Sequence, residues 1–332
     1  MKPNSTTQTN AVQNKTALSA LEPRGTRIVL HNLLRWQLAA AYIPLESRSN
    51  SSQLSGTQRS TLRGRGIDFD EVRLYQAGDD VRSVDWRVTA RTGKMHTKIF
   101  HEEKERPVLL VIDLRSGMYF GSRRCFKSVL AANAAALLAW AAVASGDRIG
   151  ALLISDNGVM DIKPQRSRHT LLQLFRQIIA LDEQHASNTP SSVSTPWQQA
   201  MQQLRVLVRP GTCVIMLSDF HDWNTQCQQA LHPVVRHSQC FAIHIHDILE
   251  KQLPAIGLVN LRSGNQTIAL DTQDTQRLAH YQQQRQHHYQ TVAAAMRTLK
   301  IPLLALQTDA GIFSSLRQFF TAGKQAGATD ER

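Results

Sequence analysis

The chain has 332 residues, and 42% of them are hydrophobic, which is enough for one large or two modest domains with a packed core. Its formal net charge is +12, and residues 1–66 carry more than half of that excess, with nine Lys and Arg against two Glu. This asymmetry predicts a basic N-terminal arm. A solvated tail and a surface for nucleic acid, anionic lipid or an acidic protein are both open interpretations of it.

The cysteines and the hydropathy of the chain indicate in which cellular compartment it is expected. The four cysteines have no paired spacing, which argues against a disulfide framework or a Cys/His zinc site and is typical of a reducing compartment. The first twenty residues are polar and lack the apolar core of a signal peptide. The longest apolar stretch, residues 129–145, contains Asn133 and is followed by a Gly-Asp turn, which favours a helix buried against a sheet. We therefore expect a cytoplasmic protein without membrane insertion.

Composition divides the chain into four parts. Residues 1–25 are predicted to form a disordered basic tail, and residues 26–105 to hold an N-terminal helix at 27–43, a mobile linker and a charged segment. Residues 106–322 alternate between strand-like and helical patterns and should form the main domain, followed by a tail at 323–332.

The main domain is predicted to be of the α/β class, with a doubly wound, mostly parallel sheet. Apolar runs with both faces covered predict strands at 107–113, 148–154, 212–219, 239–247 and 301–309. Helical patterns lie between them at 123–145, 169–181, 196–207, 225–236 and 274–299. A small β-hairpin insertion is predicted at 257–271, with its turn at 263–265.

Several predicted strands end on a carboxylate, and Asp113 and Asp219 are the two of greatest interest. In an open α/β sheet, ligands bind beyond the carboxyl ends of the strands, at the point where the strand order reverses. We expect any functional chemistry at these positions.

Three segments resemble the metal-site segments of von Willebrand factor A domains: LVIDLRSGM, the Ser194-Thr195-Pro196 helix start and MLSDF. The resemblance implies a divalent cation such as magnesium, held by Asp113, Thr195 and Asp219. Arg115 and Gly117 occupy the two positions that are serine in such domains, so the predicted metal site is degenerate. Two interpretations stay open: a cation site in which Ser116 supplies an oxygen, or a crevice filled by Arg115, with Arg115 and Ser116 forming a crest that binds a partner.

A second resemblance rests on residues 64–122, GRGIDFDEVRLYQAGDDVRSVDWRVTARTGKMHTKIFHEEKERPVLLVIDLRSGMYFGS. This block resembles the signature of the bacterial family called domain of unknown function fifty-eight, and the resemblance extends over about residues 60–320. Membership would imply partnership with AAA+ ATPases of the MoxR type, and other von Willebrand factor A-like proteins are further candidate partners. Many relatives carry two membrane helices ahead of the block, and we expect none in this chain.

The same block concentrates charges of both signs around aromatic residues, which predicts a mutually satisfied ionic network that forms a rigid lid on the sheet domain. A docking face for a partner or ligand is the alternative, and the two overlap. The residues of this charged lid are Arg73, Asp79, Asp80, Arg82, Asp85, Trp86, Arg87 and Arg91.

The patterns predict a non-catalytic adaptor that needs no cofactor. The family resemblance implies that it acts with a MoxR-type ATPase in the assembly or maturation of another protein complex. The chain lacks the GxxxxGK[ST] and GxSxG patterns of P-loop ATPases and α/β-hydrolases. Two alternatives remain: a nucleic-acid-binding protein that uses the basic arm, and a metal-dependent phosphoryl hydrolase that uses the acidic cluster around Asp79 and Asp80. His244 and His246 share one face of a predicted strand, where core or crevice histidines are favoured over a metal pair.

Overall fold

The computed structural model describes residues 21–45, 67–76, 81–102, 105–187, 196–254, 256–263 and 266–328. The chain divides into two compact units, a small one within residues 49–105 and a large one formed by the rest. Each unit is described by itself.

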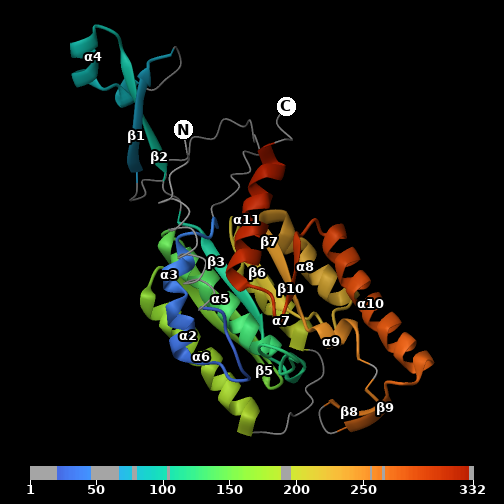
Figure 1. Cartoon of the computed structure of the whole chain (residues 1–332). Coiled ribbons are helices and arrows are strands. Elements are labelled where there is room, and N and C mark those ends of the chain that lie inside the picture. The colour runs from blue at the N-terminus through green and yellow to red at the C-terminus, as the bar shows by residue number, and fades with distance from the viewer. Residues whose placement is uncertain are drawn as a thin grey trace, which may run out of the picture. The chain divides into compact units, whose positions relative to one another are not determined.

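The large unit is a mixed α/β structure with a six-stranded, mostly parallel sheet flanked by helices (Figure 1). This confirms the predicted α/β class and the mostly parallel sheet. The strand order is β10-β7-β6-β3-β4-β5, and β5 alone runs antiparallel to its neighbour. The strands are β3 (Pro107–Asp113), β4 (Arg148–Ser155), β5 (Gly158–Gln165), β6 (Cys213–Ser218), β7 (Gln239–His246) and β10 (Leu303–Gln307).

Runs of apolar residues form the central strands because helices cover both faces of the sheet. Along β3, Leu110 and Ile112 face one hydrophobic cluster, whereas Leu109 and Val111 face another, and all four are fully buried. The first cluster includes side chains of α5 (Lys127–Ala144), α6 (Arg168–Ser187) and α11 (Ile312–Ala328). The second includes side chains of α7 (Pro196–Leu207), α8 (Thr225–His237) and α10 (Thr275–Thr298).

The edge strand β5 was not predicted from the sequence. It approaches β4 closely at Gly150, where an added Cβ would lie 2.7 Å from the carbonyl oxygen of Ile162 in β5. Met160 and Asp161 are exposed, so the strand lacks the doubly covered apolar pattern of the others. A half-covered edge strand after a short turn therefore has a weaker sequence signal.

Helix α5 is the long apolar segment of the sequence. Among the described residues it is the one helix with the length and composition to cross a membrane, and 89% of it is buried inside the large unit. Asn133, which interrupts its apolar run, accepts a hydrogen bond at Oδ1 from Nε1 of the fully buried Trp36, at 2.9 Å. Packing in the protein interior thus accounts for its hydropathy.

Residues 21–45 belong to the large unit. Two short helices, α2 (Leu30–Arg35) and α3 (Gln37–Ala40), pack their buried side chains into the cluster that contains α5. Composition predicts a disordered tail as far as residue 25. In the structure, however, the amide of Gly25 donates to the carbonyl of Arg124 at 2.9 Å. The Glu22 carboxylate also accepts a hydrogen bond from the amide of Ile312 at 3.0 Å. Residues 21–25 are therefore tied to the large unit.

Two strands and a helix make up most of the described part of the small unit. Strand β1 (Ile67–Leu74) pairs antiparallel with β2 (His96–Glu102), and η1 (Val81–Ser83) precedes α4 (Trp86–Thr92). Asp85 caps α4 by accepting hydrogen bonds from the amides of Arg87 and Val88. Gly93 ends the helix in the left-handed conformation, with φ of 69°.

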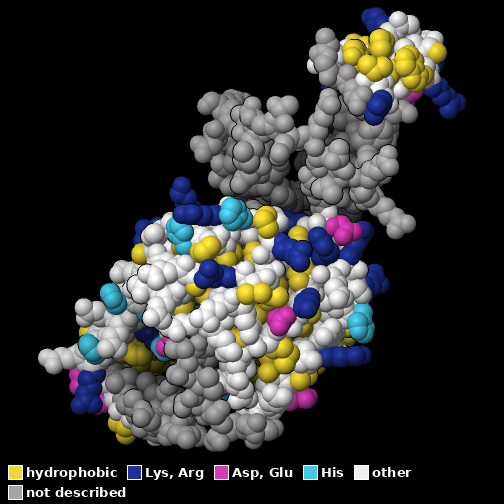
Figure 2. Space-filling view, turned by 180° about the vertical axis from the view of Figure 1, so that it is seen from behind, with side chains coloured by type: hydrophobic (Ala, Val, Ile, Leu, Met, Phe, Trp, Pro, Cys, Tyr) yellow, Lys and Arg dark blue, Asp and Glu magenta, His cyan; other side chains and the backbone are white. Residues whose placement is uncertain are grey.

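The remaining elements follow β7. Helix α9 (Ile248–Lys251) begins at the capping box of Asp247 and Glu250, and β8 (Leu258–Ser263) pairs antiparallel with β9 (Gln266–Asp271). The predicted turn residues Gly264 and Asn265 lie outside the described residues. On the face seen in Figure 2, Lys and Arg side chains are spread among neutral ones, and Asp and Glu are fewer.

Candidate functional site

The strand order of the sheet reverses between β3 and β6. From β3 the chain crosses to β4 on one side, and it later returns to β6 on the other side of β3. Asp113 is the last residue of β3, and Asp219 directly follows β6. Both carboxylates therefore lie at the edge of the sheet where open α/β folds bind ligands.

Arg115 pairs with Asp113 through two parallel hydrogen bonds. Its Nη2 lies 2.8 Å from Oδ2 of Asp113, and its Nε lies 3.0 Å from Oδ1. The Asp113 side chain is fully buried and the Arg115 side chain is 10% exposed. Burial alone would lower the pKa of Arg115, but Asp113 and two neighbouring carboxylates outweigh it and raise that pKa, so the guanidinium stays charged.

The same guanidinium connects the ion pair to the loop after β6. Its Nη1 donates to Oδ2 of Asp222 at 3.2 Å, and its Nη2 donates to the carbonyl of His221 at 3.1 Å. The guanidinium carbon also lies 5.8 Å from the centre of the Trp197 ring, on the first turn of α7. Arg115 thus ties together the ends of β3, β6 and α7.

A second buried cation, Lys127, lies between two carboxylates. Its Nζ is 2.7 Å from Oδ2 of Asp219 and 2.6 Å from Oε1 of Glu250, and the side chain is 2% exposed. Burial alone would lower the pKa of Lys127 and raise that of Asp219, but the mutual attraction prevails in both cases. The pKa of Lys127 is raised and the pKa of Asp219 is held well below its usual range.

Protein donors engage every oxygen of the two strand-end carboxylates. Oδ1 of Asp113 accepts from the Arg115 amide and Nε, and Oδ2 accepts from Arg115 Nη2 and from the hydroxyl of Ser218 at 2.6 Å. Oδ1 of Asp219 accepts from the amide of His221, and Oδ2 accepts from Lys127. With a guanidinium and an ammonium already in place, these residues do not fit a divalent cation. Thr195, the third predicted ligand, lies outside the described residues.

Ser116, on the predicted crest, has a different partner. Its amide donates to Oδ2 of Asp156 at 2.9 Å, and its hydroxyl donates to Oδ1 at 3.2 Å. Asp156 follows β4, so the crest connects the carboxyl ends of β3 and β4. The Ser116 hydroxyl therefore faces a carboxylate of the protein.

The loop after β6 has a strained backbone. Phe220 and Asp222 have φ of 53° and 66°, a region that residues with side chains occupy at a cost of about 1–2 kcal/mol each. The buried Phe220 ring stacks on Trp197, and the amide of Phe220 donates to the hydroxyl of Ser218. These contacts hold the strained loop so that the Asp222 side chain, 64% exposed, lies at the rim of the crevice.

Several residues of this site were not identified from the sequence, among them Lys127, Glu250 and Asp222. Lys127 had a usable signal, because it opens an otherwise apolar helix at the end where the helix dipole disfavours a cation. Glu250 comes from α9, far along the chain, and nothing in its local sequence points to this contact.

The predicted charged lid lies in the small unit. Asp85 is the cap of α4, and Trp86, at the start of this helix, is 63% exposed. Arg87 and Arg91 are exposed on the same helix, and Nη1 of Arg73 donates to the carbonyl of Leu74 at 3.1 Å. Arg82 lies in η1. Asp79 and Asp80 lie outside the described residues.

Comparisons with known proteins identify a family. The family described as "Protein of unknown function DUF58" matches residues 71–291. Uncharacterized proteins of Mycobacterium bovis and Mycobacterium tuberculosis are each 28% identical over 299 residues, covering 88% of this chain and 91% of theirs. A solved structure, the conserved hypothetical protein BatB from Bacteroides thetaiotaomicron, has a TM-score of 0.39 and 12% identity and covers 66% of this chain and 99% of that chain.

Proposed function

Because the chain belongs to the family of proteins of unknown function DUF58, we propose that it is a non-catalytic adaptor which acts in the cytoplasm with a MoxR-type AAA+ ATPase. In this proposal the ATPase supplies the energy for assembling or maturing another protein complex, and the chain supplies recognition. The large unit would be a von Willebrand factor A-like domain whose cation site has been replaced by ion pairs.

One observation carries the proposal, namely the buried cations at the switch point. Arg115 and Lys127 neutralise the two carboxylates that would otherwise act as metal ligands or as acid and base. A carboxylate whose oxygens all accept hydrogen bonds from the protein is poorly placed to abstract a proton or bind a metal. Such a crevice is better suited to holding a surface in a fixed shape than to chemistry.

The rim offers groups that a partner could reach. The side chains of His221 and Asp222 are 60% and 64% exposed, and they lie on the strained loop that Arg115 anchors. Preorganised polar groups at a rim favour specificity, because binding then costs little conformational entropy. We define His221, Asp222 and Ser116 as the recognition rim.

The charged lid would provide a second contact. Trp86 is 63% exposed, and exposed tryptophans next to arginines are typical of the energetic centres of protein interfaces. Since Asp85 fixes the start of α4, Trp86 is presented on a rigid helix.

Calorimetric titration of the purified chain with a purified MoxR-type AAA+ ATPase tests the proposal. We expect saturable binding that persists when the ATPase active site carries a hydrolysis-blocking substitution, because recognition by the adaptor should not require turnover. If the chain bound neither the ATP-bound nor the ADP-bound form of the ATPase, the partnership would be refuted.

A further inference from the structure

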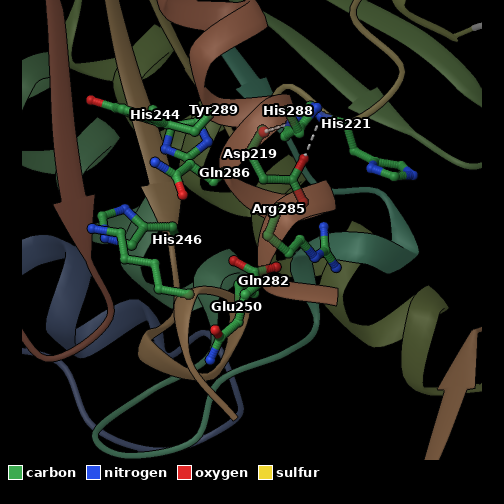
Figure 3. Close-up of a pocket in the computed structure, with 11 residues that line it drawn as sticks. Asp219, His221, His244, His246, Glu250, Gln282, Arg285, Gln286, His288 and Tyr289 are labelled. Carbon is green, nitrogen blue, oxygen red and sulfur yellow. Dashed lines mark hydrogen bonds between the residues drawn. The ribbon is translucent and has the colours of Figure 1, made fainter. Parts of the chain in front are cut away.

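A cavity of about 320 Å³ opens beside the crevice, at the carboxyl ends of β6 and β7 (Figure 3). Helices α9 and α10 supply its other walls, through Glu250 and Lys251 on one side and Gln282, Arg285 and Gln286 on the other. Its volume is at the lower end of the range for small-ligand sites. Sequence reasoning did not identify it, because its residues come from three distant segments.

Two histidines in this cavity have buried ring nitrogens without partners. His244 and His246 are 6% and 5% exposed, and their rings stack with centres 5.5 Å apart. Among the described residues, Nδ1 of His244 and both ring nitrogens of His246 have no hydrogen-bond partner. Buried polar atoms are nearly always satisfied, so these nitrogens indicate that a further molecule is expected here.

The charged side chains that line the cavity indicate the charge of the expected ligand. Its two carboxylates are already occupied: Asp219 accepts from Lys127 and the amide of His221, and Glu250 accepts from Lys127 and the amide of Asp247. Within the described residues neither Arg285 nor Lys251, which also line the cavity, forms an ion pair. Arg285 hydrogen-bonds with the side chain of Tyr281 and is attracted by the nearby Glu250 and Asp219. Lys251 and the remaining N–H groups of Arg285 are therefore the cationic groups that an anion would meet.

The surrounding side chains favour a planar anion. The Arg285 guanidinium lies 5.6 Å from the centre of the Tyr281 ring and hydrogen-bonds with that side chain, and its remaining N–H groups match a ligand with two oxygens. Neutral imidazoles can each donate one hydrogen bond, and burial keeps the pKa of both His244 and His246 below its ordinary value. Figure 3 shows Gln286 together with His244 and His246 among the residues that line the cavity.

We propose that this cavity binds a carboxylate, with Arg285 and Lys251 pairing with its charge and His246 and His244 donating hydrogen bonds to it. The carboxylate comes either from a small free acid or from an acidic side chain or C-terminus of a peptide segment. The site goes beyond the adaptor proposal, because it can be tested on the purified chain without an ATPase.

The test is calorimetric titration of the full chain with glutarate, with a short peptide ending in two glutamates and with inorganic phosphate. We expect at least one of the two carboxylate probes to bind at a single site and to shift the NMR signals of the His244 and His246 rings. Binding of glutarate indicates a free acid, and binding of the peptide alone indicates a protein segment.

Variants locate the binding site. Combining Arg285→Gln with Lys251→Gln should weaken binding about tenfold or more, since two charge-assisted hydrogen bonds are lost. Arg277→Gln is the matched control, because Arg277 lies on the same helix but pairs with Asp274 outside the cavity, and it should leave affinity unchanged. The proposal is overturned if neither carboxylate probe binds, if the double variant binds as tightly as the wild type, or if phosphate binds as tightly as the carboxylates.

Discussion

Arg115 and Asp113 are two residues apart in the chain and form a buried, two-pronged ion pair at the point where the strand order reverses. Because Arg115 and Asp113 are so close in sequence, they can pair without long-range folding. The pair lies beyond the carboxyl ends of the strands, where open α/β sheets bind ligands. The guanidinium of Arg115 thereby lies against Asp113 at the carboxyl end of β3, and we propose that no divalent cation binds there.

Replacing Arg115 by serine, the residue of the metal-binding motif, should strongly destabilise the large unit. The substitution leaves the Asp113 carboxylate buried and partly unpaired, which costs about 3–5 kcal/mol in comparable buried pairs. Denaturant unfolding measures the change. Arg123→Ser is the control: the pair of Arg123 with Asp309 is exposed, so its loss should cost about 1 kcal/mol or less.

Magnesium should not stabilise the wild-type chain. A ligand that binds only the native state raises the melting temperature with its concentration, and here the carboxylates are already neutralised by Arg115 and Lys127. A thermal melt over a series of magnesium concentrations should give a constant midpoint, with calcium as a comparison. A steady rise of the midpoint with magnesium alone would restore a working cation site.

Removing the charge of Lys127 should destabilise the protein, and a second substitution should partly reverse the effect. Lys127→Met leaves Asp219 and Glu250 facing each other without their shared cation, at a cost of about 3–5 kcal/mol. Adding Glu250→Gln removes the repulsion, so the double variant should be more stable than the single one. Additive losses in the double-mutant cycle would mean that the three groups do not interact as described.

Acidification should destabilise the fold through His244. Burial, followed by the neighbouring His246, lowers the pKa of His244 to about 3, whereas the unfolded chain has a value near 6.5. Between these values the unfolded state binds more protons, so stability falls as the pH drops from about 6.5 towards 3, by at most about 1.4 kcal/mol per pH unit from this group. His244→Phe fits the surrounding aromatic rings and should flatten the pH dependence of unfolding relative to the wild type. Parallel curves for the two proteins would exclude His244 as the source.

Two substitutions in the charged lid should affect stability and partner binding separately. Asp85→Ala removes the cap of α4 and should destabilise the small unit by about 1 kcal/mol. Trp86→Ala truncates a side chain that is 63% exposed, so it should leave the melting curve unchanged while weakening binding of the ATPase. If Trp86→Ala left that affinity intact, the lid would have only a structural role.

Sequence patterns predicted the sheet well where burial is complete. Runs such as residues 107–113 and 213–218 are covered on both faces, and their β-branched and Leu content identifies them without any alternation. Strand β1 was missed because a register shift between Phe69 and Glu71 breaks the alternation: Ile67 and Phe69 are followed by apolar residues at Val72 and Leu74.

Local sequence also predicted part of the site. Asp113 and Asp219 were found because each ends a strand, and the partner of Asp113 lies two residues away. The role of Lys127 depends on Glu250, 123 residues further on, and the cavity near His246 depends on a helix that follows much later in the chain. Contacts of this kind follow from topology, which periodicity alone does not reveal.

The proposed role of the recognition rim is tested most directly by measuring the affinity of a MoxR-type ATPase for a chain with a reversed charge at that rim. Asp222→Lys changes a side chain that is 64% exposed, and Asp161→Lys makes the same charge change at an exposed position on edge strand β5. With both variants folded as judged by their melting curves, we predict that Asp222→Lys binds the ATPase about tenfold more weakly or worse, and that Asp161→Lys binds it as the wild type does. Equal affinity of the Asp222 variant and the wild type would contradict the claim that this rim recognises the partner.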